Sequence, residues 1–166
     1  MARLDDDRTF GWGWGRHRWL IHPARWAYRF LHRSERYADP EKMVRGYEDA
    51  IATSIRIFGP DGGPTNNGRH HLATELERTG QLAEARVLRE EVLNAYRRHR
   101  DSEDPGVLAA EEYLAANLYR SGMFDEARPL FTHVRDSRER TLGSEDPATQ
   151  RPGNWLAAMD SNQEQG

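Results

Sequence analysis

The stretch "LATELERTGQLAEAR", residues 72–86, returns in altered form as "LAANLYRSGMFDEAR", residues 114–128. Sliding the chain on itself so that Leu72 falls on Leu114 aligns a Leu-Ala pair, a glycine and a Glu-Ala-Arg triplet in these two copies. A second shift of the same length brings Leu156-Ala157 into the column of the Leu-Ala pair. Self-similarity at one fixed period of about 20 to 50 residues is typical of structural units that stack on one another.

The segments between the copies repeat as well. "DSEDPGVLAAEEYLA", residues 101–115, matches "GSEDPATQRPGNWLA", residues 143–157, and "GPDGGPTNNGRHHLA", residues 59–73, is a weaker copy. Asp104-Pro105 and Asp146-Pro147 each supply an N-cap oxygen and a proline suited to the first helical position. We therefore expect a helix to begin at both places. A further column holds an arginine just before each linker, at Arg56, Arg98 and Arg140.

Each period contains two amphipathic helical patterns. The longer pattern is formed by Met43, Tyr47, Ala50, Ile51, Ile55 and Phe58, then by Leu82, Ala85, Leu88, Val92 and Tyr96, and again by Phe124, Ala127, Leu130, Phe131 and Val134. The shorter is formed by Leu72, Ala73 and Leu76, and by Leu114, Ala115 and Leu118. Gly80 and Gly122 fall where the shorter helix ends, and glycine adopts a left-handed turn without a Cβ penalty. The two patterns predict an antiparallel helix hairpin.

These residues resemble the tetratricopeptide repeat, whose motif places small and large apolar residues, a glycine and an alanine at set offsets. The 42-residue period and the "GSEDP" linker are similar to the longer repeat of the kinesin light chain type, which is also common in bacterial regulators. The resemblance covers residues 39–158. It implies an all-α fold, an α-solenoid of antiparallel helix hairpins with about seven helices. It also implies the binding of a peptide or partner protein, with no particular partner indicated.

Three segments are expected along the chain. Residues 1–22 form an N-terminal arm rich in Trp and Arg, residues 23–160 form the repeat domain, and residues 161–166 form a polar tail. A degenerate first unit is expected to begin near Pro23. In the last copy Asp160 replaces the leucine of the column, so the final unit is expected to be a first helix without its second helix.

Composition limits the class of protein. The chain has 166 residues, no cysteine and a net charge of -3, and 31% of its residues are charged. The absence of cysteine excludes disulfides and thiolate metal sites. The sequence shows no apolar run of about 18 residues and no apolar signal-peptide core. We therefore expect a cytoplasmic protein.

Candidate contacts with a partner come from the offsets that the family uses for its groove, on the concave face lined by the first helices. They are Asn67, His70, Thr74, Glu77 and Arg78, then Ala109, Glu112, Ala116, Tyr119 and Arg120, and finally Arg151, Asn154 and Ala158. One column, Arg36, Arg78 and Arg120, is uniform and would suit an acidic peptide or a C-terminal carboxylate. The alternative is that these arginines interact favourably with the helix dipole and with the neighbouring acids Glu35 and Glu77.

The arm "FGWGWGRHRWLIH", residues 10–22, contains Trp12, Trp14 and Trp19. One interpretation is an N-terminal cap that covers the apolar flank of the first helix pair, as solenoid ends require. The alternatives are docking of the arm into the groove of another copy, attachment to a membrane surface and binding of nucleic acid. The acidic remainder of the chain disfavours nucleic acid.

No motif points to bond chemistry. Adjacent histidines such as His70 and His71 diverge on a helix and are poorly placed to hold one metal ion. "GPDGGPTNNG", residues 59–68, follows a helix and lacks a P-loop lysine, so it is interpreted as a linker. We therefore expect no catalytic residue, no metal and no cofactor.

The predicted function is that of an adaptor or scaffold that binds a protein or peptide, and the alternative is a regulatory sensor for a small ligand or signalling peptide. Trp155 and Leu156 lie on a final helix with no following helix to cover it. This flank is either small or covered by a partner, which predicts a homodimer or a partner-capped end.

Overall fold

The computed structural model describes residues 39–163, which contain six α-helices and no β-strand in that range. The helices are α2 (Pro40–Phe58), α3 (Gly63–Arg78), α4 (Leu82–Arg97), α5 (Pro105–Arg120), α6 (Phe124–Leu142) and α7 (Pro147–Gln163). The starts of α3, α5 and α7 are spaced by the period of the sequence repeat, as are those of α2, α4 and α6. The predicted first unit, the arm with Trp12, Trp14 and Trp19, and Arg36 lie outside the described residues.

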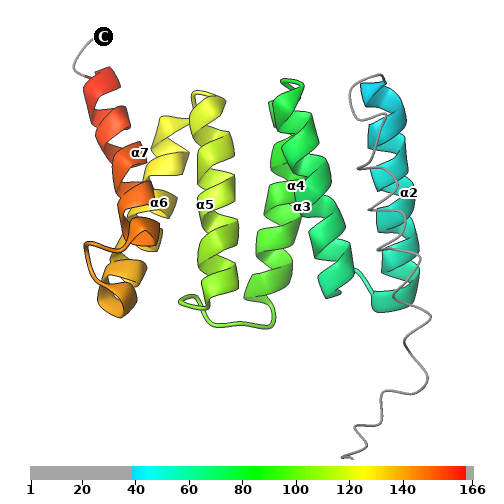
Figure 1. Ribbon diagram of the computed structural model, residues 1–166, viewed down its shortest axis with the longest axis horizontal. Helices are drawn as coiled ribbons and strands as arrows, with labels where there is room; N and C mark the ends of the chain where they lie inside the picture. Colours follow the sequence, from blue (N-terminus) through cyan, green and yellow to red (C-terminus); the bar gives the residue numbers. More distant parts are fainter. Residues whose placement is uncertain (1–38, 164–166) are drawn as a thin grey trace, which may run out of the picture. The chain divides into compact units, whose positions relative to one another are not determined.

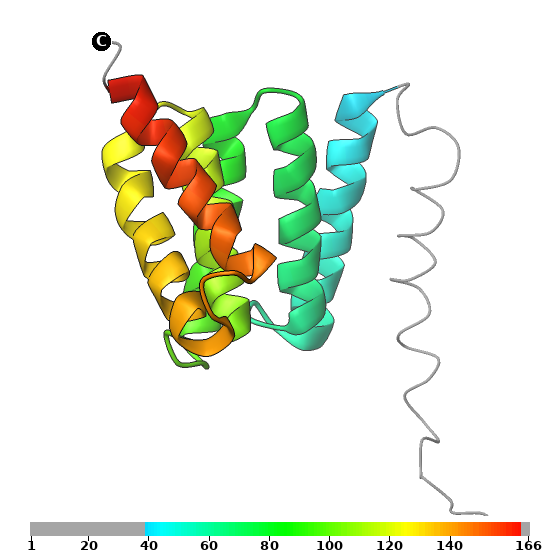
Figure 2. The same cartoon turned by 60° about the vertical axis from the view of Figure 1, so that its left-hand side comes forward.

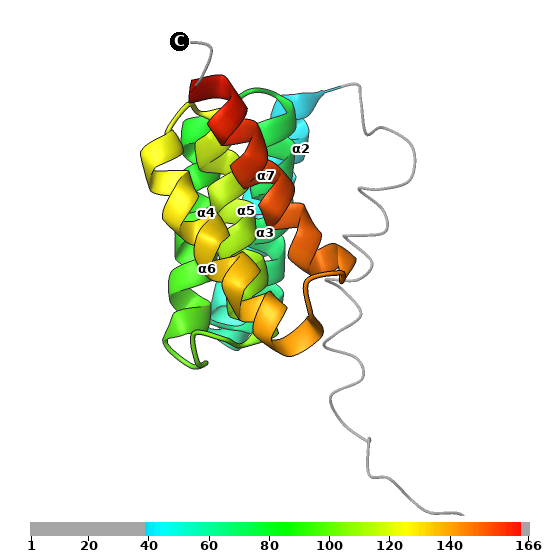
Figure 3. The ribbon, with the colours of Figure 1, turned by 90° about the vertical axis from the view of Figure 1, so that its left-hand side faces the viewer.

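Successive helices run in opposite directions, and each packs mainly on its neighbours in the chain (Figure 1, Figure 2). We call α3, α5 and α7 the first helices of their hairpins, and α2, α4 and α6 the second helices. Seen from the α7 end, α4 lies behind α6 and α3 lies behind α5 (Figure 3). The predicted all-α solenoid of antiparallel hairpins is confirmed. None of the described helices is long and apolar enough to cross a lipid bilayer.

The helices end and begin at the glycines and Asp-Pro pairs that recur with the repeat. Gly80 and Gly122 have φ angles of 83° and 75°, in the left-handed region directly after α3 and α5. The following residues close the same turn, with Gln81 N–H donating to Leu76 O at 2.8 Å and Met123 N–H donating to Leu118 O at 2.9 Å. Such bonds satisfy carbonyls that a helix end leaves without partners.

The Asp-Pro pairs start helices as predicted. Asp104 accepts a hydrogen bond from Gly106 N–H at 2.8 Å, and Pro105 is the first residue of α5. Asp146 accepts from Ala148 N–H at 2.7 Å, directly before α7. The same local rule therefore sets the start of two successive first helices.

The interpretation of residues 59–68 as a linker was wrong for its second half, because α3 already begins at Gly63. Pro64 suits the first turn of a helix, where no N–H donor is needed. Thr65 and Asn66 are buried and donate to the carbonyls of Gly59 and Asp61 at 2.9 and 3.0 Å. These bonds tie the short linker to the first turn of α3.

Replacing Gly80 with alanine is expected to lower the free energy of unfolding by about 1 kcal/mol, because an L-residue is strained at this positive φ. A Cβ at Gly80 would meet no atom within 4 Å, so the loss measures backbone strain and not a clash. Urea unfolding followed by circular dichroism measures it. Gly63→Ala is the control: its Cβ also meets nothing, and the residue lies in the first turn of α3. If the two variants were equally stable, the left-handed turn would not be a constraint.

Buried residues occupy equivalent columns in the stacked hairpins. Leu72 and Leu114 are both buried, and the alanine that follows each of them is fully buried. The same holds for Ala85 and Ala127 on the second helices. Small side chains at these positions let neighbouring helices approach closely. The expected equivalence of residues one period apart is therefore confirmed for the described hairpins.

The last helix departs from these columns on its outer side. Leu156 is buried and Trp155 is half-buried, with its ring stacked 5.8 Å from that of Phe131, but Ala157 is exposed. Gln150 and Asp160 are exposed where α5 has the buried leucines Leu108 and Leu118. The outer side of α7 is therefore small and polar, the first of the two alternatives for this flank. The helix also continues to Gln163, three residues into the expected tail.

Candidate functional site

The expected groove residues divide into exposed and buried groups. Asn67, Thr74 and Arg78 are exposed on α3, Arg120 on α5 and Asn154 on α7, whereas His70 and Tyr119 are half-buried. The carboxylates of Glu77 and Glu112 are 4% and 9% exposed, so they are buried anchors and not surface contacts. We call the solvent-facing side of α3, α5 and α7 the first-helix surface.

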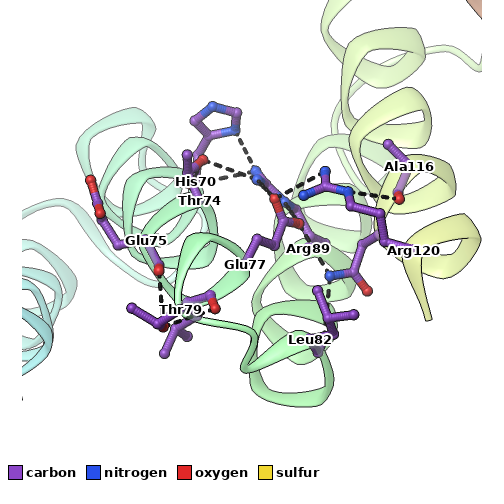
Figure 4. A network of polar contacts seen from close by, with 11 residues as sticks. His70, Thr74, Glu75, Glu77, Thr79, Leu82, Arg89, Ala116 and Arg120 are labelled. Atoms are coloured by element: carbon purple, nitrogen blue, oxygen red, sulfur yellow. Dashed lines mark hydrogen bonds and ion pairs between the residues drawn. The ribbon is translucent and has the colours of Figure 1, made fainter. Parts of the chain in front are cut away.

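Glu77 is the centre of a polar network that joins three helices (Figure 4). Arg89 of α4 donates from Nε and Nη2 to the two carboxylate oxygens of Glu77, each at 3.1 Å. Asn117 of α5 donates to Oε1 at 3.1 Å, and Arg120 Nη2 lies 3.3 Å from Oε2. A single buried carboxylate thus links α3, α4 and α5.

The charge of Glu77 is retained in spite of its burial. Burial on its own would raise the pKa of the carboxyl group, but the hydrogen bonds and charge of Arg89, followed by the charge of Arg120, lower the pKa below its ordinary value. Arg89 is also buried, at 3% exposure of its side chain. Its remaining N–H groups are satisfied by Thr74 Oγ1 at 3.0 Å and His70 Nδ1 at 2.8 Å. The buried ion pair is therefore surrounded by hydrogen-bond partners.

A second network of the same kind lies one hairpin further along. Arg138 of α6 donates to Glu112 Oε2 at 2.7 Å and to Ala148 O at 2.7 Å. Arg151 of α7 donates from Nη2 to the same carboxylate oxygen at 2.8 Å and from Nε to Glu112 Oε1. Burial alone would raise the pKa of Glu112, but the bonds from Arg151 and Arg138 lower it overall. Glu112 therefore joins α5, α6 and α7 as Glu77 joins α3, α4 and α5.

Arg78 and Arg120 of the expected arginine column make contacts with other groups of the protein. Arg78 donates from Nε to Glu75 Oε2 at 2.8 Å. Arg120 donates from Nε to Ala116 O at 3.2 Å, a carbonyl of the last turn of α5, and approaches Glu77. These contacts match the alternative interpretation, in which the arginines bind helix carbonyls and pair with neighbouring acids. The side chain of Arg120 is nevertheless 43% exposed, so part of its guanidinium group faces solvent.

Tyr113 is the large exposed aromatic residue of the first-helix surface, at 46% exposure. Its ring lies 4.5 Å from that of His70 in an edge-to-face arrangement, and the guanidinium carbon of Arg89 lies 5.0 Å from its centroid. Arg89 and His70, which both belong to the network around Glu77, therefore contact the Tyr113 ring. The arrangement presents a rigid aromatic face with basic groups beside it.

Comparison with known proteins agrees with this architecture. The sequence profile of the tetratricopeptide repeat family matches residues 109–148, which cover most of the α5–α6 hairpin and the start of α7. Two crystal structures of nearly identical TPR-like repeats of a kinesin light chain protein from Podospora anserina superpose with a TM-score of 0.71 at 26% identity. The superposition covers 82% of this chain and 66% of that one, so the chain spans just under two thirds of its relative. The chain therefore contains a tetratricopeptide repeat, and its helical solenoid is similar to the repeats of the kinesin light chain type.

The similarity in fold extends to BtubC (BKLC) from P. vanneervenii, with a TM-score of 0.63 at 16% identity over 82% of this chain and 64% of that one. Among curated proteins no sequence matches significantly. Proteins with tetratricopeptide repeats generally bind proteins or peptides, and the fold serves typically as a scaffold without catalytic groups. In the part of the chain that the structure describes, no cluster of three or more His, Asp or Glu residues could hold a metal ion.

Sequence reasoning missed Tyr113, although a signal was available. His71, Tyr113 and Trp155 follow one another at the period of the repeat, so the chain has an aromatic column on its first helices. The expected groove contacts lie in the neighbouring column, which contains the buried Glu112. The arginine column before the linkers has a structural role, because Arg98 pairs with Asp61 and Arg140 with Glu103 across the same separation along the chain.

His70 makes stability depend on pH. Burial, followed by the charge of Arg89, lowers the pKa of His70 from 6.5 to about 4 in the folded state. Since the unfolded chain binds the proton more readily, this contribution is present above pH 6.5 and is lost as the pH falls toward 4. After allowance for solvent screening we expect a loss of about 1–2 kcal/mol over this window. Below about pH 4.5 protonation of Glu77 and Glu112, whose pKa values are also lowered, would add to it.

Urea unfolding at pH 7 and at pH 5 measures this dependence. His70→Asn removes the titrating group while an amide oxygen can still accept from Arg89. The variant is expected to lose less stability than the wild type between the two pH values. Equal losses in both proteins would show that His70 is not the group responsible.

Proposed function

We propose that the protein is an adaptor that binds a peptide or protein segment on its first-helix surface, around Tyr113. The observation that carries the proposal is the exposed ring of Tyr113, held against His70 and Arg89. A rigid aromatic side chain offers a large contact area at a low cost in conformational entropy, and Tyr and Arg are enriched among residues that dominate binding energy.

The charges near Tyr113 favour a partner with acidic groups. Each buried carboxylate is contacted by two arginines, Arg89 and Arg120 at Glu77 and Arg138 and Arg151 at Glu112. One positive charge is therefore left at each network, and it resides largely on the exposed members, Arg120 and Arg151. Guanidinium groups with free N–H donors bind carboxylates through charge-assisted hydrogen bonds.

The test measures binding of a partner segment to the full chain and to the Tyr113→Ala variant. We expect Tyr113→Ala to weaken binding roughly tenfold or more, because it removes the aromatic contact at the centre of the surface. Val87→Ala is the matched control, since Val87 is 54% exposed but lies on the second helix α4. Isothermal titration calorimetry with peptides selected on the wild-type chain provides the affinities. Equal effects of the two substitutions would contradict the proposed surface.

A charge test addresses the acidic partner separately. Reversal of Arg78 and Arg120 together keeps the Tyr113 side chain but changes the charge of the first-helix surface, and circular dichroism of the variant checks that its fold is retained although Arg120 contacts Glu77. Unchanged binding by this double variant would remove the acidic partner while leaving the peptide-binding surface intact.

A further inference from the structure

His70 is held in one protonation state and one tautomer by its contacts. Arg89 Nη1 lies 2.8 Å from His70 Nδ1, and a guanidinium group can only donate a hydrogen bond. Nδ1 must therefore carry the accepting lone pair, and the single imidazole proton must lie on Nε2. The contact fixes which edge of the ring is the donor.

The groups that face His70 from each helix maintain this state. On α3 they are His71, whose ring lies 5.6 Å away, and Glu77, whose negative charge is directed to Arg89. From α4 comes Arg89, and from α5 comes the ring of Tyr113. The cation opposes protonation of the imidazole, and the bidentate bond to Glu77 prevents Arg89 from moving away. The pKa of about 4 agrees with a neutral ring across the physiological range.

The ring of His70 lies beside that of Tyr113, with the two ring centroids 4.5 Å apart. The His70 ring is half-buried, its Nδ1 bonds to Arg89, and its backbone carbonyl accepts from Arg89 and Thr74. Figure 4 shows the second ring nitrogen of His70 directed away from Arg89. A donor that is neutral, fixed in direction and adjacent to an aromatic platform suits recognition of an acceptor oxygen.

We propose that His70 is a specificity-determining residue whose Nε2–H donates to a carbonyl or carboxylate oxygen of the peptide bound against Tyr113. The inference rests on the proposed function and adds the chemistry of one contact to it. Because the ring stays neutral, this contact is retained from pH 8 to about pH 5, where an ordinary histidine would gain a charge.

The first experiment is performed on the free protein. Two-bond ¹H–¹⁵N NMR spectra of the full chain with labelled histidine, assigned with the His70→Asn variant, report the protonation of each ring nitrogen. We expect an unprotonated Nδ1 and a protonated Nε2 at every pH from 5 to 8. A proton on Nδ1, or an imidazolium ring at pH 6, would overturn the inference.

The second experiment separates the two edges of the ring. A library of random peptides displayed on phage is selected on the full chain, and the selected peptides are measured against two folded variants. His70→Gln retains an amide donor near the Nε2 position, and His70→Asn retains an acceptor near Nδ1 but no donor near Nε2. We expect His70→Asn to weaken binding roughly three- to tenfold, the effect of one hydrogen bond, and His70→Gln to stay within about twofold of the wild type.

The outcomes distinguish this inference from the proposed function. Peptides that lose affinity with Tyr113→Ala but not with His70→Asn would overturn the role of His70 alone. A selection that yields no peptide sensitive to Tyr113→Ala would overturn the binding surface, and with it this contact. Exchange of each acidic residue of the selected peptide for its amide identifies the acceptor: a loss indicates a carboxylate, and no loss indicates a main-chain carbonyl.

Discussion

Glu77→Gln is expected to lower the free energy of unfolding by about 3 kcal/mol, because it leaves the buried guanidinium group of Arg89 without its counter-charge. Both side chains are almost fully buried, so water cannot replace the lost charge. The amide can still accept one hydrogen bond from Arg89, but its NH₂ group would face the donors of Arg89 or Arg120. Urea unfolding at pH 7, followed by circular dichroism, measures the loss.

Glu75→Gln on the same helix is the matched control. Glu75 pairs with Arg78 across one helical turn, where the arginine side chain is 45% exposed, and such pairs contribute less than about 1 kcal/mol. A double-mutant cycle with Arg89→Met isolates the pair, and the double variant is expected to lose less than the sum of the single losses. If Glu77→Gln were no more harmful than Glu75→Gln, the network would not stabilise the junction of α3, α4 and α5.

The boundaries of the helices could be predicted because they depend on local chemistry. Gly80 and Gly122 turn left-handed for reasons that one residue and its immediate neighbours determine, and Asp104 and Asp146 cap the helices that follow them. The predicted linker after Gly59 was too long, because glycines and Pro64 favour irregular structure when the sequence is considered locally. Its helical second half depends on hydrogen bonds from buried side chains to the linker, which composition does not reveal.

The candidate site could be predicted only in part, because the period identifies equivalent positions but not the reach of long side chains. Glu112 was expected on the surface from its offset, yet Arg138 and Arg151 approach it from two later helices at separations unrelated to the period. Arg120 is partly exposed and contacts Glu77, an acid expected from the sequence only as a neighbour of this arginine column. Tyr113 lies in the column of His71 and Trp155, whose members are all aromatic but differ in residue type. A search for identical residues at the repeat period therefore does not find it.

Ala115→Leu is expected to destabilise the protein by about 2–3 kcal/mol, because Ala115 is fully buried where two helices come close together. Three additional heavy atoms would force shifts in the cluster that contains Leu93, Leu118 and Phe131. Alanine and leucine have similar helix propensities, so the change tests packing and not helix formation. Denaturant unfolding again provides the measurement.

Ala157→Leu is the control that the repeat itself provides, since Ala157 lies in the same column one period later and is exposed. Its effect should lie within about 0.5 kcal/mol of the wild type, as for a surface substitution. Equal tolerance at both positions would contradict the close approach of helices at Ala115. Equal damage at both would instead mean that the outer side of α7 is covered, and sedimentation of the wild type and Ala157→Leu would then show whether a second copy covers it.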